Sequence, residues 1–335
     1  MAESQALRVV TVGLGPIGAT TTRIVLERRS LRLVAAVDSD PAKQGRDLAE
    51  VLELEAPTGV IVGGDLAEAL QRHEPDVLLL CTSSFFPEVR RDLLLAAAAG
   101  VDVVSSCEEM LLPDLSHPEL AREIHEAAVA GGATLLGTGV NPGFVLDFLP
   151  VLATAVSREV VHVRGLRIVD AGTRRLPLQR KVGAGLSVDE FGERVAAGRL
   201  GHIGMRESVA LVGRALGIEL DEVTQTVEPV VADSDRSTRF LTIPAGSVAG
   251  IRNEGVGRQR GEVRVQLQLQ MYVGAPEPRD EVFLLGRPNL HLRIDGGVAG
   301  DEATAAILVN SLRQVVAAPP GLKTVLDLPP PRLTP

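Results

Sequence analysis

The stretch Val12-Gly13-Leu14-Gly15-Pro16-Ile17-Gly18 decides the fold of this chain. It carries a G-x-G-x-x-G motif at the end of the apolar run 7–13, which predicts a buried strand. A segment that predicts a helix follows, up to about residue 29, and Pro16 suits its first turn, where no N–H is needed. A strand, a glycine-rich turn and a helix in this order are typical of a dinucleotide-binding Rossmann unit.

Each glycine of this turn has its own role in binding a dinucleotide. Gly13 permits the tight turn, Gly15 allows a pyrophosphate to approach the backbone, and Gly18 lets the helix pack closely on the strand. The start of the helix also offers N–H groups and a partial positive charge to the phosphates. The predicted cofactor-binding residues of the turn are Gly13, Leu14, Gly15, Pro16, Ile17 and Gly18.

Asp38 supplies the acid that this fingerprint requires. It ends the second apolar run, 31–37, and follows Gly18 by about 20 positions, the spacing at which a carboxylate accepts hydrogen bonds from the adenosine ribose. Its charge also repels the 2′-phosphate of NADP. The sequence therefore predicts NAD as the cofactor, and NADP stays open because Lys43 and Arg46 follow closely.

The first 141 residues repeat the pattern of apolar strand and helix. We expect further strands at 60–62, 77–81, 101–104 and 134–136, and helices at 41–54, 65–72, 86–99 and 117–130. This alternation predicts an α/β fold, a doubly wound parallel sheet with helices on both faces. Residues 1–141 are thus the expected dinucleotide-binding Rossmann domain.

The second half of the chain has a different periodicity. Apolar and polar residues alternate through Val263–Val273, which predicts a long strand with one buried and one polar face. Its expected neighbours are strands at 160–169, 223–231 and 290–294. A second α+β domain with a largely antiparallel sheet is therefore predicted over 142–300, before a C-terminal helical segment, 301–328, and a proline-rich tail, 329–335.

Two short patterns predict where helices begin. Ser116 with Glu119 and Ser187 with Glu190 both match the capping box, in which a hydroxyl and a carboxylate satisfy N–H groups at a helix start. Another helix is expected from about Met205 to Leu216.

Composition excludes several classes of protein. A formal net charge of -9 argues against a nucleic-acid partner, which needs basic patches. No apolar run reaches the roughly 18 residues of a membrane span, and the first residues carry no apolar export signal. The 6 histidines lack metal-ligand spacing, so no metal site is expected, and 2 cysteines cannot form a disulfide scaffold. A cytoplasmic protein is predicted.

Three predicted strand ends offer room for the rest of a cofactor. Ligands bind beyond the carboxyl ends of the strands in such sheets. The segments 81–84, 105–109 and 137–144 are rich in small or polar residues, which lets a nicotinamide lie against the backbone. The candidate cofactor contacts in them are Thr82, Ser83, Cys107 and Asn141.

Two acids, Glu108 and Glu109, directly follow Cys107. A carboxylate at a strand end suits acid/base chemistry, although the pair could equally begin a solvent-facing loop. Cys107 as a nucleophile would instead make the chain an acylating aldehyde dehydrogenase. Activation of a thiol needs a nearby cation or base, whereas adjacent carboxylates raise its pKa, so an unreactive Cys107 is favoured.

Several phrases resemble the 2,4-diaminopentanoate dehydrogenases and the related native amine dehydrogenases. They are Cys107-Glu108-Glu109, Gly137–Phe144 with its Asn-Pro-Gly-Phe, Lys181–Leu186, Gly201–Ser208 and Gly300–Thr304. The resemblance extends from the first strand to about residue 328. The N-terminal domain is also similar to that of dihydrodipicolinate reductases.

The resemblance implies an NAD(P)-dependent oxidoreductase acting on CH–NH2 donors, which interconverts an amine and a ketone or aldehyde plus ammonia. Its catalytic glutamate falls on Glu108, and its cofactor and substrate loops fall on 82–84 and 141–144. Asn310 is implied to return to the cofactor domain on the last helix and to bind the cofactor. The family that the chain resembles is homodimeric, with the second sheet at the subunit interface.

The low aromatic content, 2%, predicts an aliphatic pocket and hence a small aliphatic amine or carbonyl substrate. The candidate substrate contacts are Asn141, Pro142, Phe144, Phe148 and His202, of which His202 is expected to line the pocket or donate hydrogen bonds rather than act as a base. Three alternatives stay open: a 2,4-diaminopentanoate dehydrogenase proper, the acylating dehydrogenase that uses Cys107, and a non-catalytic NAD(H)-binding sensor.

Overall fold

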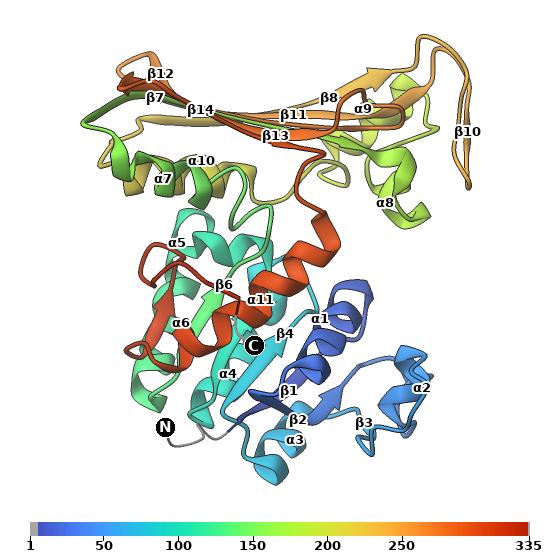
Figure 1. Cartoon of the computed structure of the whole chain (residues 1–335), viewed down its shortest axis with the longest axis vertical. Coiled ribbons are helices and arrows are strands. Elements are labelled where there is room, and N and C mark those ends of the chain that lie inside the picture. Colours follow the sequence, from blue (N-terminus) through green and yellow to red (C-terminus); the bar gives the residue numbers. More distant parts are fainter. Residues whose placement is uncertain (1–5, 334–335) are drawn as a thin grey trace. The chain divides into compact units, whose positions relative to one another are not determined.

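The computed structural model describes residues 6–333, which fall into two compact units (Figure 1). The first unit contains the chain up to Gly143 together with the segment from Ala299 onward. The second unit is the continuous segment Phe144–Val298. The C-terminal segment is therefore part of the same unit as the glycine-rich turn.

The first unit is built on a seven-stranded parallel sheet. Its order is β15-β6-β5-β4-β1-β2-β3, so the chain reverses its direction of travel across the sheet beside β1. Such a reversal is where doubly wound sheets bind their ligands. The strands are β1 Leu7–Val12, β2 Leu31–Val37, β3 Val62–Gly63, β4 Val77–Leu80, β5 Asp102–Ser105, β6 Thr134–Gly137 and β15 Gly321–Lys323.

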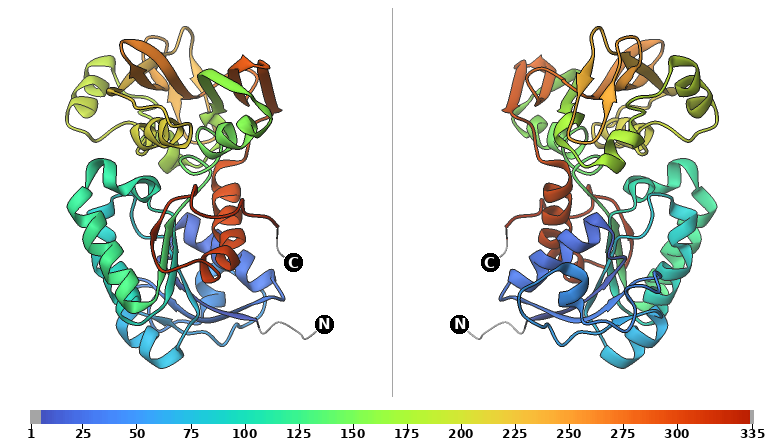
Figure 2. Two further views of the ribbon diagram at one scale, coloured as in Figure 1. Left: turned by 90° about the vertical axis from the view of Figure 1, so that its left-hand side faces the viewer. Right: turned by 90° about the vertical axis from the view of Figure 1, so that its right-hand side faces the viewer.

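Helices pack on this sheet, and the last of them comes from the C-terminal segment. Helix α11 contacts α1 and the strands β4, β5 and β6, and it is the orange-red helix next to blue α1 in Figures 1 and 2. The helices are α1 Pro16–Glu27, α2 Leu48–Leu52, α3 Leu66–His73, α4 Phe86–Ala98, η1 Glu108–Leu111, α5 Pro113–Ser116, α6 Pro118–Gly131 and α11 Gly300–Val316. The predicted doubly wound α/β fold is confirmed.

Two predicted helix boundaries in this unit are wrong for local reasons. The helix expected over 41–54 covers only 48–52, because Asp47 caps a later start by accepting a hydrogen bond from Ala49 N and also binds the backbone of Thr58 and Gly59. The Ser116 capping box does not form. Ser116 ends α5, and Pro118 begins the next helix with no side chain capping it.

The second unit is a six-stranded mixed sheet of order β14-β13-β7-β12-β11-β8. Only β7 and β12 pair in parallel among its described strands, which confirms the largely antiparallel prediction. The strands are β7 Glu159–Asp170, β8 Glu222–Val231, β11 Val248–Gln259, β12 Glu262–Tyr272, β13 Arg279–Arg287 and β14 Leu290–Asp295, and β9 Arg236–Ser237 pairs with β10 Thr242–Ile243.

Helices α7 and α10 lie on one side of this sheet (Figure 1). Val265, Leu267 and Leu269 of β12 are buried on that side, as their period of two predicts. The helices and 3-10 turns of the unit are α7 Phe148–Ala153, η2 Thr154–Val156, η3 Ala171–Thr173, α8 Leu176–Lys181, α9 Val188–Ala196 and α10 Met205–Ala215. The capping box predicted for Ser187 and Glu190 forms at the start of α9.

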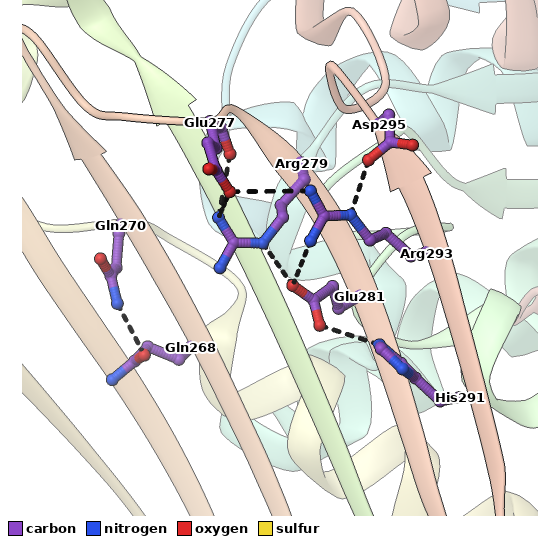
Figure 3. A network of polar contacts seen from close by, with 8 residues as sticks. All are labelled: Gln268, Gln270, Glu277, Arg279, Glu281, His291, Arg293 and Asp295. Carbon is purple, nitrogen blue, oxygen red and sulfur yellow. Dashed lines mark hydrogen bonds and ion pairs between the residues drawn. The ribbon is translucent and has the colours of Figure 1, made fainter.

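The opposite side of the sheet, the polar face, carries Gln266, Gln268 and Gln270 of β12. Near β13 and the edge strand β14 it also carries a network of charges (Figure 3). Glu281 is at its centre, in ion pairs with Arg279, Arg293 and His291. In the part of the chain that the structure describes, no helix has both the length and the apolarity to cross a membrane.

Candidate active site

The glycine-rich turn between β1 and α1 fits a dinucleotide. A Cβ at Gly13 would be 2.5 Å from the Cys81 carbonyl oxygen, and a Cβ at Gly18 would be 1.7 Å from the Gly13 oxygen, so neither position tolerates a side chain. Gly15 is different, because a Cβ there would meet nothing within 4 Å. The open space lies at the position where a pyrophosphate must approach the backbone.

The N-terminus of α1 is also available to an anion. Gly15 is its N-cap and, as a glycine, has no side chain that could accept a hydrogen bond from the N–H groups of the first turn. These groups, which no residue within the helix satisfies, and the partial positive charge of the helix suit a phosphate. The turn therefore fits the pyrophosphate of a nicotinamide dinucleotide.

Asp38 lies at the end of β2, beside this turn, and only 6% of it is exposed. Its Oδ2 accepts a hydrogen bond from Leu14 N at 2.6 Å and its Oδ1 accepts one from Asp40 N at 2.8 Å. Lys43 Nζ is 2.8 Å from Oδ2. Burial opposes ionisation, but Lys43 and the two backbone donors outweigh it and lower the pKa of Asp38. The carboxylate is thus ionised and fixed where an adenosine ribose is expected.

The strand end after β4 contains the next two predicted contacts. Thr82 is exposed, and its Cγ2 would be 3.0 Å from a Cβ at Gly13, which places it beside the turn. Ser83 Oγ accepts a hydrogen bond from Phe85 N at 3.1 Å and donates one to Glu88. Ser83 therefore organises the start of α4, a role that the sequence did not indicate.

Cys107 follows β5 with its side chain in the core, 1% exposed. Burial, together with the charges of Glu109 and Glu108, raises its pKa to about 12. Such a thiol is not a nucleophile at neutral pH. The buried thiol of Cys107 therefore does not support an acylating aldehyde dehydrogenase. A contact of Cys107 with a cofactor would involve its backbone, because its side chain is in the core.

Glu108 and Glu109 are the first two residues of the 3-10 helix η1. Successive side chains of a 3-10 helix diverge by about 120°. Glu109 Oε2 accepts a hydrogen bond from Phe86 N at 2.7 Å and is 3.3 Å from His117 Nε2. Glu109 thus holds the start of α4, and Glu108, which is partly buried, lies beside it at the first position of η1.

Helix α11 contacts the loop that carries Asn141 and Pro142. Thr304 Oγ1 accepts a hydrogen bond from Val140 N at 3.3 Å and would be 3.9 Å from a Cβ at Gly139. Asn310 Oδ1, on the same helix, is buried without a hydrogen-bond partner among the described residues. A buried acceptor of this kind fits a donor from a bound molecule. Sequence reasoning missed Thr304 as an anchor of the loop, although it lies in one of the phrases that carry the resemblance.

The remaining predicted substrate contacts belong to the second unit. Phe144 is partly exposed, whereas Phe148 on α7 is 4% exposed and packs into the core. His202 is held through its backbone, because its N–H donates to Asn253 Oδ1 and its carbonyl accepts from Gln225 Nε2, both at 3.1 Å. Sequence reasoning missed Asn253 and Gln225, since a single polar residue in a strand carries no distinguishing pattern.

The His202 imidazole is a neutral group. Burial, together with the positive charges of Lys181 and Arg167, lowers its pKa to about 3. A neutral imidazole can donate or accept a hydrogen bond but is a poor general base at this pKa. This agrees with the expectation that His202 is not the base.

Both halves of the chain match known families. The model of the 2,4-diaminopentanoate dehydrogenase C-terminal domain matches residues 144–334, and that of the dihydrodipicolinate reductase N-terminus matches residues 7–107. The chain is 32% identical over 340 residues to a 2,4-diaminopentanoate dehydrogenase of Acetoanaerobium sticklandii, covering 98% of this chain and 95% of that protein. It is 29% identical over 350 residues to an amine dehydrogenase of Streptomyces virginiae, covering 96% of each.

A solved structure gives the same result. The amine dehydrogenase of Mycobacterium smegmatis is 28% identical, with a TM-score of 0.86 over 100% of this chain and 99% of that one. The resemblance found in the glutamate and Asn-Pro-Gly-Phe phrases is therefore confirmed over the whole length. The chain belongs to the 2,4-diaminopentanoate dehydrogenase family.

Proposed function

We propose that this protein is an NAD(P)-dependent amine dehydrogenase, which catalyses the reversible oxidative deamination of an amine to a ketone or aldehyde plus ammonia. The relatives named amine dehydrogenase and 2,4-diaminopentanoate dehydrogenase support this activity. The observation that carries it is Glu108, an acid at the end of β5 in the unit that holds the dinucleotide turn.

A bound nicotinamide supplies or accepts the hydride of such a reaction. Glu108 supplies the proton transfers. As a carboxylate it takes a proton from ammonium or from the attacking amine, and as the acid that results it helps to expel water from the carbinolamine. Positive charge then develops on the iminium carbon and nitrogen, and the Glu108 carboxylate stabilises that charge when it is deprotonated again.

The cofactor proposed is NAD, bound by Gly13–Gly18 at the pyrophosphate and by Asp38 at the adenosine ribose. The ionised, buried carboxylate of Asp38 supports NAD because it opposes a 2′-phosphate. Thr82 and Asn310 are the proposed contacts at the nicotinamide end. Thr82 is exposed at the strand end after β4, and Asn310 Oδ1 is buried without a hydrogen-bond partner among the described residues.

The substrate proposed is a small aliphatic amine, or the matching carbonyl compound with ammonia. One observation favours a second candidate, a 2,4-diaminopentanoate-like substrate with a carboxylate. Lys181 acts electrostatically on His202, a predicted substrate contact, so a positive charge acts at this residue. Positive charge of this kind suits an anionic group.

We also propose that the chain forms a homodimer through the polar face of its second sheet. This face carries both signs of charge, with Arg279 and Arg293 beside Glu277 and Glu281 (Figure 3). A two-fold axis brings identical patches together, so a patch that carries both signs can complement itself. The cytoplasmic location stays a prediction.

The experiment that tests the activity is a screen that follows NADH at 340 nm, a wavelength at which only the reduced cofactor absorbs. With small aliphatic ketones and aldehydes, NADH should be consumed only when ammonium is present. Consumption without ammonium would identify a carbonyl reductase, and tight NADH binding without any turnover would identify the sensor. Including 2,4-diaminopentanoate and the matching amine without a carboxylate separates the two substrate candidates.

A further inference from the structure

The contact between Asp38 and Lys43 changes what this site does with a 2′-phosphate. An isolated carboxylate at the end of β2 would exclude NADP by charge repulsion. Here Lys43 Nζ is 2.8 Å from Asp38 Oδ2, and the carboxylate is buried while a quarter of the lysine side chain (25%) is exposed. The pair carries no net charge, so it repels a 2′-phosphate less than a lone aspartate would.

The ammonium of Lys43 also has capacity for a ligand. A lysine offers three N–H donors. Among the described residues, Lys43 Nζ donates to Asp38 Oδ2 and, at 3.2 Å, to the carbonyl oxygen of Leu14. One donor is left, on a group that lies between the glycine-rich turn and the ribose-binding acid.

The segment that carries Lys43 is fixed to the edge of the sheet. Gln44 Nε2 donates to the Asp38 carbonyl at 2.9 Å, Gly45 N donates to Val62 O at 2.9 Å, and Lys43 N donates to Asp40 O at 3.0 Å. The side chain of Gln44 also lies where a Cβ at Gly64 would be, 2.8 Å away. The backbone of this turn is therefore anchored, and only the flexible end of Lys43 is free to reorient.

Arg46, the other cation near this site, is oriented differently. Its Nε is 3.1 Å from Glu50 Oε2 and its Nη1 donates to Ala42 O at 3.5 Å. It is thus engaged with the exposed surface of α2 and the turn before it, and it does not contact Asp38.

We propose that Lys43 gives this site dual cofactor specificity: it neutralises Asp38 when NAD is bound and turns to the 2′-phosphate when NADP is bound. The proposal rests on the proposed function, in that it takes the site to hold a nicotinamide dinucleotide. It deepens that function, because the preference for NAD that Asp38 imposes becomes a modest one.

The test is direct binding of NADH and NADPH to the full-length protein, followed by cofactor fluorescence and without any amine. The wild type should bind both, with dissociation constants within about tenfold of each other. Lys43→Met should weaken NADPH binding by about 10- to 100-fold, the size of a lost charge-assisted hydrogen bond, and change NADH binding by less than about threefold. Lys43→Arg should retain most of the NADPH affinity, and the matched control Arg46→Met should change neither constant.

Equal losses for both cofactors in Lys43→Met would show a purely structural role and overturn the proposal, as would an unchanged ratio of the two constants. If Lys43→Met fails to fold, the proposal is tested with Lys43→Arg and with the salt dependence of cofactor binding to the wild type. Added salt should weaken NADPH binding more than NADH binding. Binding of NADH alone would overturn the inference and leave the proposed function intact. Binding of neither cofactor would overturn both.

Discussion

Arg167 and Asp280 form an ion pair inside the second unit, with Arg167 Nη1 2.8 Å from Asp280 Oδ2 and exposures of only 3% and 2%. Each partner has a further backbone contact with Val298, whose oxygen accepts from Arg167 at 2.6 Å and whose N–H donates to Asp280 at 2.7 Å. Burial lowers the pKa of Arg167 and raises that of Asp280, so the two charges depend on each other. The pair joins β7 to β13 and fixes the end of the second unit.

Removing one partner of this pair should strongly destabilise the protein. Arg167→Met leaves the Asp280 carboxylate buried without its counterion, a change that typically costs about 3–5 kcal/mol. Urea unfolding should show this loss, while Arg293→Met, which breaks more exposed pairs, should change the free energy of unfolding much less. Equal effects of the two substitutions would contradict the assignment of Arg167 as a structural residue.

Asp102 should make stability depend on pH in the weakly acidic range. Burial, opposed by a hydrogen bond from Thr134 N and assisted by the charge of Asp76, raises its pKa to about 6, above the usual range of an aspartate. The folded state then holds the proton more tightly than the unfolded state. Stability from this group is fully present below about pH 4 and is lost as the pH rises through about 6.

Asp102→Asn should therefore raise stability at pH 8 by about 1–2 kcal/mol, because the amide oxygen still accepts the Thr134 hydrogen bond and no buried charge forms. As the pH rises from 4 to 8, the urea midpoint of the wild type should fall relative to that of the Asp102→Asn variant at the same pH. The exposed Glu126→Gln serves as the control, and a wild type and variant with parallel profiles would show that Asp102 does not titrate there.

The proposed dimer should be sensitive to charge at the centre of the polar face. Gln268→Lys places an ammonium there in each copy, and like charges meet across a two-fold axis. Light scattering over a range of micromolar concentrations should give the dimer mass for the wild type and a shift to one chain mass for this variant. The same substitution on the exposed surface of α3, Gln71→Lys, should leave the dimer intact.

Cys107→Ser should remain active. The thiol is buried and protonated, with a pKa of about 12, so the reaction does not use it as a nucleophile. The small change in size and polarity should cost about 1 kcal/mol of stability. A variant that folds but has lost all activity would restore the acylating mechanism.

The parts of this molecule that the sequence predicted are those whose signals are local. The glycine-rich turn, Asp38 and the alternating strand β12 follow from spacing and period alone, and all three lie where they were expected. Strand β11 was missed because Gly255 and Gly257 break its apolar pattern. Met205 and Val209 of α10 pack against Gly255, and Val209 also packs against Gly257, so that a Cβ at either glycine would lie 2.8 Å from the helix. The packing of a helix elsewhere in the chain therefore selects these glycines.

In the candidate site, too, the features with local signals could be predicted from the sequence and the long-range contacts could not. The positions of Glu108 and Cys107 at a strand end could be predicted, whereas the contacts that decide their roles could not. Glu109 is occupied by a hydrogen bond from Phe86, 23 positions away in the chain, and Thr304 reaches Val140 across 164 positions. Lys43 was noted as a nearby cation, but only the folded turn shows that it pairs with Asp38 and that Arg46 does not.

The two neighbouring glutamates should give opposite kinds of variant. Glu108→Gln removes the proposed acid/base, so amine oxidation and reductive amination should fall by about 10²- to 10⁴-fold while NADH affinity and the unfolding midpoint stay unchanged. Glu109→Gln weakens the acceptor for Phe86 N and the contact with His117, so it should lower stability by about 1 kcal/mol and reduce the rate much less. Steady-state kinetics in both directions, NADH titration and urea unfolding of the two variants separate these effects. Full activity of Glu108→Gln would refute its catalytic role, and a loss in Glu109→Gln as large as that in Glu108→Gln, at unchanged stability, would move the chemistry to the second glutamate.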